Sequence, residues 1–193
     1  MPDPSNSTRH VRALFDDETI RVYQAYRDEI ADAALAAGRF VPPFRRSRMT
    51  WIKPSFLWMM YRCGWTEKDA GQRRVLAIDL SRSGFESALR QACPSDETNP
   101  TARKAHVRVQ WDPERDLYLR RLPMRSLQVG LSGPAIAAYA DEWTVRLSEV
   151  TELAKNIHEH LRRGERLAAE QLLPPERHYP LPLDVAERIG ADG

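Results

Sequence analysis

The segment MTWIKPSFLWMMYRCGW, residues 49–65, decides how the central part of the chain folds. Residues 49–53 are rich in β-branched and aromatic side chains, which predicts a short strand. Pro54 suits the first turn of a helix, where its missing N–H is not needed. The helix expected over residues 56–63 is apolar on almost every side, as buried helices are, and Gly64 can provide its left-handed cap.

Lys53 is the informative residue of this segment, because it comes directly before the predicted helix. A cation there meets the positive end of the helix dipole, so we expect a negatively charged group beside it. Arg45, Arg46 and Arg48 lie just upstream and could complete a site for a phosphate or pyrophosphate. Lys53 could instead pair with an Asp or Glu from elsewhere in the chain, or its alkyl stem could carry the ammonium to water.

The composition indicates a single globular domain. The 193 residues carry a formal net charge of only +2, which predicts no general electrostatic footprint for nucleic acid. No run of about 18 apolar residues is present and residues 1–10 lack an apolar signal core, so we expect a cytoplasmic protein without membrane contact. Cys63 and Cys93 do not make a disulfide framework, and no Cys/His spacing predicts a metal site.

The first predicted strand, residues 18–27, alternates between two faces. Gln24 falls in line with Ile20, Val22 and Tyr26, so a polar amide points to where the core is expected. Gln24 is therefore either a buried amide with all its hydrogen bonds made or a residue that lines a cleft.

The whole pattern predicts an α+β fold, a single domain over residues 1–193 with mixed or antiparallel sheets and helices packed outside them. We expect residues 1–15 to be loose and residues 174–193 to form an extended, proline-rich tail. The remaining predicted elements are a helix at 28–37, a strand at 75–80, a helix at 85–92, a loop at 94–104, a strand at 106–111, a turn at 112–113, strands at 117–119 and 127–131, and helices at 134–143, 148–163 and 165–173. Residues 143–147 also fit a strand.

Five motifs carry a family resemblance: IRVYQAY at 20–26, MTWIKPSFLWMMYRCGW at 49–65, VQWDPER at 109–115, RSLQVGLSG at 125–133 and LPPERHYPLP at 173–182. Through them the chain resembles the uncharacterised family called domain of unknown function 4291, over most of its length. The resemblance implies membership of that family and brings little chemistry with it.

The order of the predicted elements also resembles the layout of ADP-ribosyltransferase-type folds. Such enzymes bind NAD in a cleft between two small antiparallel sheets, and a late glutamate helps to stabilise the charge that develops on the ribose. The likeness implies that Gln24 or Tyr26 occupies the first-strand position. It places Trp51 or Lys53 on the second strand and Glu114 at the acidic position.

The sequence departs from that layout at two places. The His or Arg common on the first strand has no evident match unless Arg21 serves. Asp112 and Glu114 stand where a Gln/Glu-x-Glu pair would be expected. The likeness therefore concerns layout alone, which does not establish function.

The first functional hypothesis is an NAD-dependent enzyme that transfers or hydrolyses ADP-ribose. NAD is its expected cofactor, and its binding residues would be Lys53, Arg48, Arg46, Trp51 and Tyr26. The catalytic candidates are Glu114 and Gln24. Glu114 would stabilise an oxocarbenium-like centre electrostatically if a cleft holds it near the ligand.

Several of these residues also fit a purely structural role. Glu114 could form a surface ion pair with Arg115 or Arg73. Asp79 lies on a predicted buried strand and could be the partner of Lys53 or a cleft residue. The tryptophans Trp51, Trp58 and Trp111 could stack on a base or nicotinamide ring, or simply belong to the core.

Two further hypotheses come from different functional classes. One is a non-catalytic module that binds a nucleotide or single-stranded nucleic acid through basic and aromatic residues, in an open groove whose affinity falls steeply with salt. The second is a scaffold that binds a protein partner through an exposed apolar patch, such as the YPLPL stretch at residues 179–183.

Overall fold

A computed structural model describes residues 8–95 and 104–192 of the protein. Its strands are β1 (Arg12–Ala13), β2 (Thr19–Tyr26), β3 (Thr50–Ile52), β4 (Arg74–Ser81), β5 (Cys93–Pro94), β6 (Val107–Arg115), β7 (Arg121–Leu131), β8 (Thr144–Glu149) and β9 (Arg177–His178). Its helices are α1 (Asp28–Ala37), α2 (Phe56–Cys63), the 3-10 helix η2 (Ala70–Gln72), α3 (Arg82–Arg90), α4 (Pro134–Ala138), the π-helix η4 (Tyr139–Trp143), α5 (Thr151–Arg162), α6 (Arg166–Gln171) and α7 (Leu183–Ile189).

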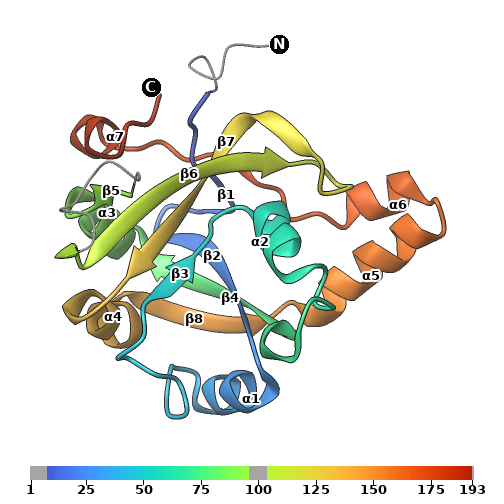
Figure 1. Cartoon of the computed structure of the whole chain (residues 1–193), viewed down its shortest axis with the longest axis horizontal. Coiled ribbons are helices and arrows are strands. Elements are labelled where there is room, and N and C mark those ends of the chain that lie inside the picture. Colours follow the sequence, from blue (N-terminus) through green and yellow to red (C-terminus); the bar gives the residue numbers. More distant parts are fainter. Residues whose placement is uncertain (1–7, 96–103, 193) are drawn as a thin grey trace.

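The strands form two larger sheets and one small pair. One sheet has the order β2–β4–β8, the other the order β3–β7–β6–β5, and β1 pairs with β9. The pairings are antiparallel except for β5 with β6. Helices lie around these sheets, as Figure 1 shows. The predicted α+β fold class is therefore confirmed.

The two larger sheets meet where Tyr23 of β2 faces Lys53, directly after β3. The N–H of Tyr23 donates to the carbonyl of Lys53 at 2.8 Å, and the N–H of Lys53 donates back at 3.3 Å. Inner side chains of both sheets, such as Ile78 and Val129, belong to one buried cluster. The core thus lies between the sheets and fixes how β2 and β3 are placed relative to each other.

A second buried cluster covers the other face of β2 and β4. Tyr23 and Ala77 of the sheet pack there with Met60 of α2 and Ile157 of α5. Most of the side chains of α2 are therefore buried, as its apolar sequence predicts. The beginning of α2 is thereby fixed against the sheets.

The central segment folds almost as predicted. β3 covers Thr50–Ile52, and Gly64 ends α2 in the left-handed conformation with φ 57°. The helix covers Phe56–Cys63, as expected, but Pro54 precedes it and does not lie in its first turn, because Ser55 is the N-cap and its hydroxyl accepts from the N–H of Trp58 at 3.2 Å. A serine hydroxyl can bond a first-turn N–H in this way, and proline has no such group.

Two predicted boundaries in the second half are wrong. β6 does not turn at Asp112–Pro113 but continues to Arg115 through a register shift, and the turn lies at residues 116–120. Residues 117–119 belong to this turn and not to a strand. Asp116 holds it, since its carboxylate accepts from the N–H groups of Tyr118 and Arg120, both at 2.9 Å. The Asp112–Pro113 pair does not form a turn here, because the pairing of β6 with β7 accommodates an irregularity between Pro113 and Arg115 as a β-bulge.

Further differences concern the region after β7. The helix predicted over residues 134–143 ends as the π-helix η4, and residues 144–149 form β8 instead of starting the next helix. α5 therefore begins at Thr151, not at residue 148. The alternative prediction of a strand over residues 143–147 is confirmed by β8, and its pairing with β4 supplies the hydrogen bonds that favour the strand over the helix.

The chain ends are more ordered than their polar and proline-rich sequences suggest. Residues 8–15, expected to be loose, contain β1, and the side chains of Val11 and Ala13 are fully buried. The tail pairs with β1 through β9 and then forms α7. Residues 1–7, and most of the loop predicted at 94–104, lie outside the described residues.

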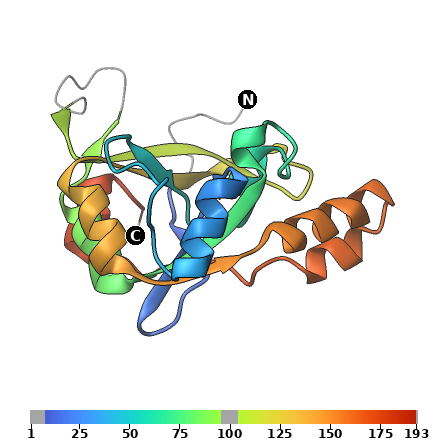
Figure 2. The same ribbon diagram turned by 90° about the horizontal axis from the view of Figure 1, so that it is seen from below.

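The helices α5 and α6 form an arm that projects from the rest of the molecule, which Figure 2 shows clearly. Within the described ranges, no helix combines the length and apolar character that a membrane crossing requires.

Candidate functional site

Polar side chains line the face of the four-stranded sheet that points away from the main core. The pairing register places Arg108 opposite Gly130, Gln110 opposite Gln128, and Asp112 opposite Ser126. Their neighbours Val109 and Val129 point into the core, because side chains alternate along a strand. The polar face thus extends from β6 across β7.

Asp112 is the centre of a small network on this face. Its carboxylate accepts from the amide of Gln128 at 2.7 Å and from that of Gln110 at 3.2 Å. Lys53 lies close enough for the charge of Asp112 to raise the pKa of its ammonium. Even so, Lys53 forms no ion pair with a carboxylate in the part of the chain that the structure describes.

Lys53 is a buried cation, only 4% exposed. Its ammonium donates weakly to the carbonyl of Trp51 at 3.4 Å and lies 5.4 Å from the centroid of the Trp58 ring. Burial is the main cause that lowers its pKa from 10.5 to about 8, and the positive charge of Arg62 adds to the effect. Among the described residues, no Asp or Glu forms the ion pair with Lys53 that was considered from the sequence. The low exposure of Lys53 also does not fit the alternative that its ammonium reaches water.

Two tryptophans border Lys53. Trp58 on α2 is 6% exposed, and its indole N–H is buried without a hydrogen-bond partner. Trp51 on β3 lies across Gly130, where an added Cβ would come within 2.9 Å of the Trp51 ring. Trp51 is half-buried, so part of its ring remains accessible beside the polar sheet face.

Glu114 lies at the start of α2 and is 6% exposed, so it is not a surface ion pair. Its carboxylate accepts from the Ser55 hydroxyl at 3.0 Å and from the N–H of Arg115 at 2.8 Å. The Arg115 guanidinium is directed elsewhere and stacks 3.5 Å from the centroid of the Tyr61 ring. Burial raises the pKa of Glu114, while these hydrogen bonds act against the rise.

Glu176 is a second carboxylate at the same helix start, and sequence reasoning missed it. It accepts from the N–H of Phe56, the first residue of α2, at 2.7 Å. Burial is the main cause that raises its pKa, and the negative charge of Glu114 raises it further. Arg12 donates to the backbone carbonyl of Glu176 at 3.3 Å, and its charge lowers the pKa of both carboxyls.

The only sequence signal for Glu176 was its place in the LPPERHYPLP motif, which carried the family resemblance but no chemistry. A carboxylate between prolines in a tail says nothing about a helix start 120 residues earlier. The β1–β9 pairing is what carries Glu176 there.

Gln24 and Tyr26 lie in the core beneath β3. The Gln24 amide donates to the Thr50 hydroxyl and to the carbonyl of Trp51, and its oxygen accepts from the hydroxyls of Tyr26 at 2.6 Å and Tyr139 at 2.5 Å. Of the two interpretations of Gln24, the satisfied buried amide fits. A catalytic role for Gln24, and a ligand contact by Tyr26, stay predictions.

The arginines upstream of Lys53 do not form a common anion site with it in the described part of the chain. Arg46 forms an ion pair with Asp141 of η4 at 2.5 Å, and both side chains are largely exposed. Arg48 is exposed. In the described part of the chain neither arginine contacts Lys53, so their roles at a pyrophosphate also stay predictions.

Asp79 forms ion pairs with two arginines and not with Lys53. Its carboxylate accepts from Arg21 at 2.7 Å and from Arg146 at 2.6 Å. Arg21 therefore has a structural partner on β4, directly opposite it in the sheet. In the same described ranges, no group of three or more His, Cys, Asp and Glu side chains could hold a metal ion.

The family model called domain of unknown function (DUF4291) matches residues 10–179. The chain belongs to the DUF4291 family. The match includes the residues near the start of α2: Arg12, Lys53, Ser55, Glu114 and Glu176. No curated protein matches the chain at a significant level. The chemistry of this DUF4291 protein therefore has to be argued from its own residues.

Proposed function

We propose that the protein binds a phosphate-bearing nucleotide at Lys53, on the outer face of the β3–β7–β6 sheet, and that NAD is this ligand. One observation carries the proposal: two buried donors lie side by side without strong acceptors. They are the Lys53 ammonium, 5.4 Å from the Trp58 ring, and the indole N–H of Trp58 itself. Buried polar groups normally have partners, so two such donors together favour an anionic ligand.

The electrostatics of the site support an anion. A buried lysine at a pKa of about 8 is only partly stabilised as a cation, because Asp112 acts on it from beyond ion-pair distance. A ligand phosphate beside the ammonium would favour the charged form and gain charge-assisted hydrogen bonds. Part of the binding free energy would thus come from stabilising the Lys53 ammonium, which burial destabilises in the free protein.

Trp51 supports a ligand that also has a flat ring. Its indole lies over Gly130, where no side chain intervenes between the ring and the sheet. Stacking on an aromatic side chain contributes about 1–3 kcal/mol per base in single-stranded nucleic-acid complexes. A nucleotide combines the phosphate that Lys53 requires with a base or nicotinamide ring that Trp51 can hold.

The finer form of the proposal is an enzyme that breaks the bond between nicotinamide and ribose. Positive charge develops on the ribose as that bond breaks, and a carboxylate beside it lowers the barrier. Glu114 is the proposed group. Burial raises its pKa, and the hydrogen bonds that the Ser55 hydroxyl and the Arg115 N–H donate to its carboxylate act against that rise. Water or an acceptor hydroxyl would then take the ribosyl group.

A thermal-shift titration of the wild type with NAD, ATP and a short single-stranded RNA tests the binding. The variant Lys53→Met keeps the length and apolar volume of the stem but removes the charge, and Lys68→Met removes an exposed lysine from the next loop as a matched control. At ~100 times its dissociation constant a ligand stabilises the folded state by ~2.7 kcal/mol. We expect NAD to stabilise the wild type and K68M and to leave K53M unchanged.

The three ligands separate the hypotheses. Stabilisation by RNA alone, falling steeply with salt, would favour the nucleic-acid module. If none of them shifts the wild type, nucleotide binding at Lys53 is wrong. When NAD binds, nicotinamide release by the wild type and by Glu114→Gln tests the enzyme. Equal release by both proteins would remove Glu114 from the chemistry.

A further inference from the structure

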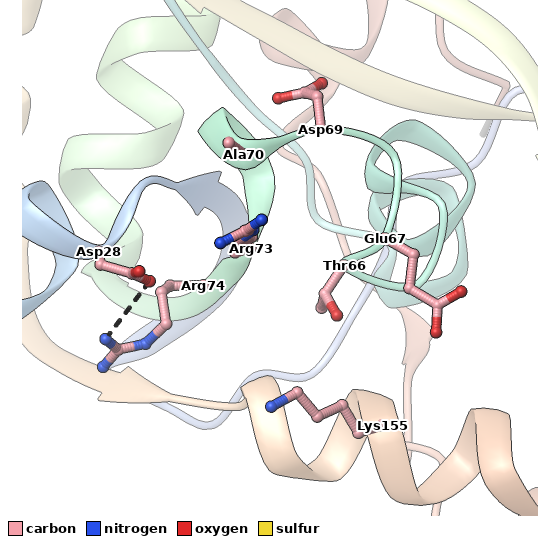
Figure 3. Close-up of a pocket in the computed structure, with 8 residues that line it drawn as sticks. All are labelled: Asp28, Thr66, Glu67, Asp69, Ala70, Arg73, Arg74 and Lys155. Carbon is pink, nitrogen blue, oxygen red and sulfur yellow. Dashed lines mark ion pairs between the residues drawn. The ribbon is translucent and has the colours of Figure 1, made fainter.

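A second site lies away from the sheet face, in a cavity of about 460 Å³. Three parts of the chain surround it: the loop after α2, the junction of α1 with β4, and the second turn of α5. Figure 3 shows Thr66, Arg73 and Lys155 around this space, one from each end of the loop and one from α5. The cavity is lined by both acidic and basic side chains. Whether it favours an anionic or a cationic ligand depends on which of these side chains are already paired within the protein.

The acidic side chains of the cavity are engaged within the protein. Glu67 accepts from the guanidinium of Arg162 at 2.8 Å. Asp69 accepts from the N–H of Gly71 at 2.8 Å and from the amide of Gln72. Neither carboxylate needs a cation from a ligand.

One of the three cations is engaged as well. Arg74 pairs with Asp32 at 2.7 Å and Glu149 at 2.5 Å, and Asp28 lies 3.8 Å away on its other side. The dashed line in Figure 3 marks the last of these contacts. Arg74 therefore ties α1 to β4 and β8 and is not available to a ligand.

The remaining donors have few partners within the described part of the protein, and the side chains of Arg73 and Lys155 are exposed. Arg73 has no hydrogen bond or ion pair with any described residue, and the same holds for the Thr66 hydroxyl. Lys155 pairs with Glu152 of its own helix at 2.8 Å, but the Glu152 side chain is 77% exposed. An exposed pair of this kind is weak and easily exchanged.

Two helices begin beside the cavity. Asp28, the first residue of α1, lines it, and α5 begins at Thr151, whose hydroxyl accepts from the N–H of Val75 next to Arg74. Neither helix has a side-chain hydrogen bond at its N-cap. Acidic residues in the first turns, Asp28 and Glu29 of α1 and Glu152 of α5, offset the positive ends of these helix dipoles, so the positive charge of the site comes from Arg73 and Lys155.

The backbone that presents Thr66 has an uncommon conformation. Gly64, Trp65 and Thr66 follow one another with φ of 57°, 52° and 75°. Residues other than glycine rarely adopt such angles, and they persist where the surrounding structure fixes them. Here Trp65 is fixed by stacking on His158 of α5, with ring centroids 5.4 Å apart.

We propose that this cavity binds the phosphate group of a small phosphomonoester. The Arg73 guanidinium provides two parallel N–H donors, Lys155 provides a point charge, and the Thr66 hydroxyl donates a third kind of hydrogen bond. A tetrahedral dianion accepts all of these at once, which a singly charged carboxylate does less well. The site is independent of Lys53 and does not rest on nucleotide binding there.

Isothermal titration calorimetry with inorganic phosphate and with glycerol phosphate tests the proposal. We expect both to bind the wild type and Lys53→Met alike, and Arg73→Ala to weaken binding at least tenfold. Lys155→Ala should weaken it several-fold. Lys68→Ala in the same loop and Arg163→Ala at the end of α5 remove the same charge outside the cavity, and they should keep wild-type affinity.

Amide NMR shifts give the location. Phosphate should move the signals of Thr66 and Glu67 in the wild type, and much less in Arg73→Ala. Equal weakening by the cavity and the control variants would mean general attraction to positive charge and would overturn the proposal. So would shifts centred on Lys53 and Ser55 with none at Thr66 and Glu67, or no binding of either probe at millimolar concentration.

Discussion

Gln24 and Lys53 donate to one acceptor, the backbone carbonyl of Trp51, at 3.3 Å and 3.4 Å. Gln24 approaches from β2 and Lys53 follows β3 directly, so this carbonyl links the buried amide to the buried cation. The amide is satisfied by four partners, whereas the ammonium has one long hydrogen bond. The two residues are neighbours with different surroundings: Gln24 holds β3 from the core side, and Lys53 is the group at which we propose that a ligand binds.

Replacing Lys53 by Met should stabilise the folded protein at neutral pH. The pKa of Lys53 falls from 10.5 to about 8 on folding, so below pH 8 the folded state holds a proton that it binds less tightly than the unfolded chain does. Wild-type stability should therefore rise as pH increases from about 8 to 10.5. A shift of this size corresponds to at most about 3 kcal/mol. Urea unfolding of both proteins at pH 7 and pH 10 measures the difference.

The control for this prediction is Lys68→Met, whose exposed lysine should leave the pH profile unchanged. If K53M follows the wild-type profile between pH 8 and 10.5, Lys53 is not a buried cation in solution. The expected higher stability of K53M also makes the NAD titration easier to interpret. If K53M is more stable than the wild type and does not respond to NAD, the lost response is not caused by misfolding.

Glu176→Gln should flatten the pH dependence of stability on the acidic side. Burial and Glu114 raise the pKa of Glu176 above its ordinary 4.5, so its contribution is fully present below 4.5 and is lost as pH rises through the folded value. Glutamine keeps an oxygen for the Phe56 N–H but cannot ionise. Denaturation midpoints between pH 4 and 9 should therefore fall more steeply for the wild type than for E176Q.

Glu176→Ala separates the charge from the hydrogen bond. It removes the acceptor for the first N–H of α2, so E176A should be less stable than E176Q by about 1 kcal/mol at every pH, the amount that the loss of a helix cap generally costs. Identical profiles for E176Q and E176A would show that the carboxylate does not cap α2.

Gln24→Leu should be strongly destabilising. The hydroxyls of Tyr26 and Tyr139 would lose their shared acceptor and Thr50 would lose a donor, all in the core. Buried groups left unsatisfied cost about 1–3 kcal/mol each, and partial relaxation brings the expected loss to about 2–4 kcal/mol. Thermal unfolding checks this, with the exposed Gln91→Leu as the control. A loss below about 1 kcal/mol would contradict the network and reopen a ligand-facing role for Gln24.

Gly130→Ala should displace the Trp51 ring, because the added methyl would lie 2.9 Å from it. Trp51 can turn away at modest cost to folding, so the main effect should be on ligand affinity, with an expected loss of about 1 kcal/mol of stacking. Binding titrations measure it. In a Trp51→Ala background the Gly130→Ala change should have no further effect, and an unchanged penalty there would show that the methyl acts elsewhere.

Much of the architecture followed from local pattern. Alternation predicted β2 with Gln24 on its buried face, and the apolar run with Gly64 predicted α2 and its end. These features depend on side-chain period and on residues with restricted backbone angles, both of which are properties of a few consecutive residues. Lys53 stood out for the same reason, as a cation in front of an apolar helix.

Only the tertiary structure decided what surrounds Lys53. The three neighbouring arginines are a local sequence feature, yet Arg46 is drawn to Asp141 on η4. Glu176 reaches α2 because the tail pairs with β1, and Asp112 reaches the sheet face because β6 continues past Pro113. Such contacts join residues far apart in the sequence, 164 positions in the case of Arg12 and Glu176, and their free energy comes from packing and strand pairing. The sequence by itself determined that a buried helix follows shortly after a lysine, whereas the pairing of distant strands determined which charges lie near that lysine and which do not.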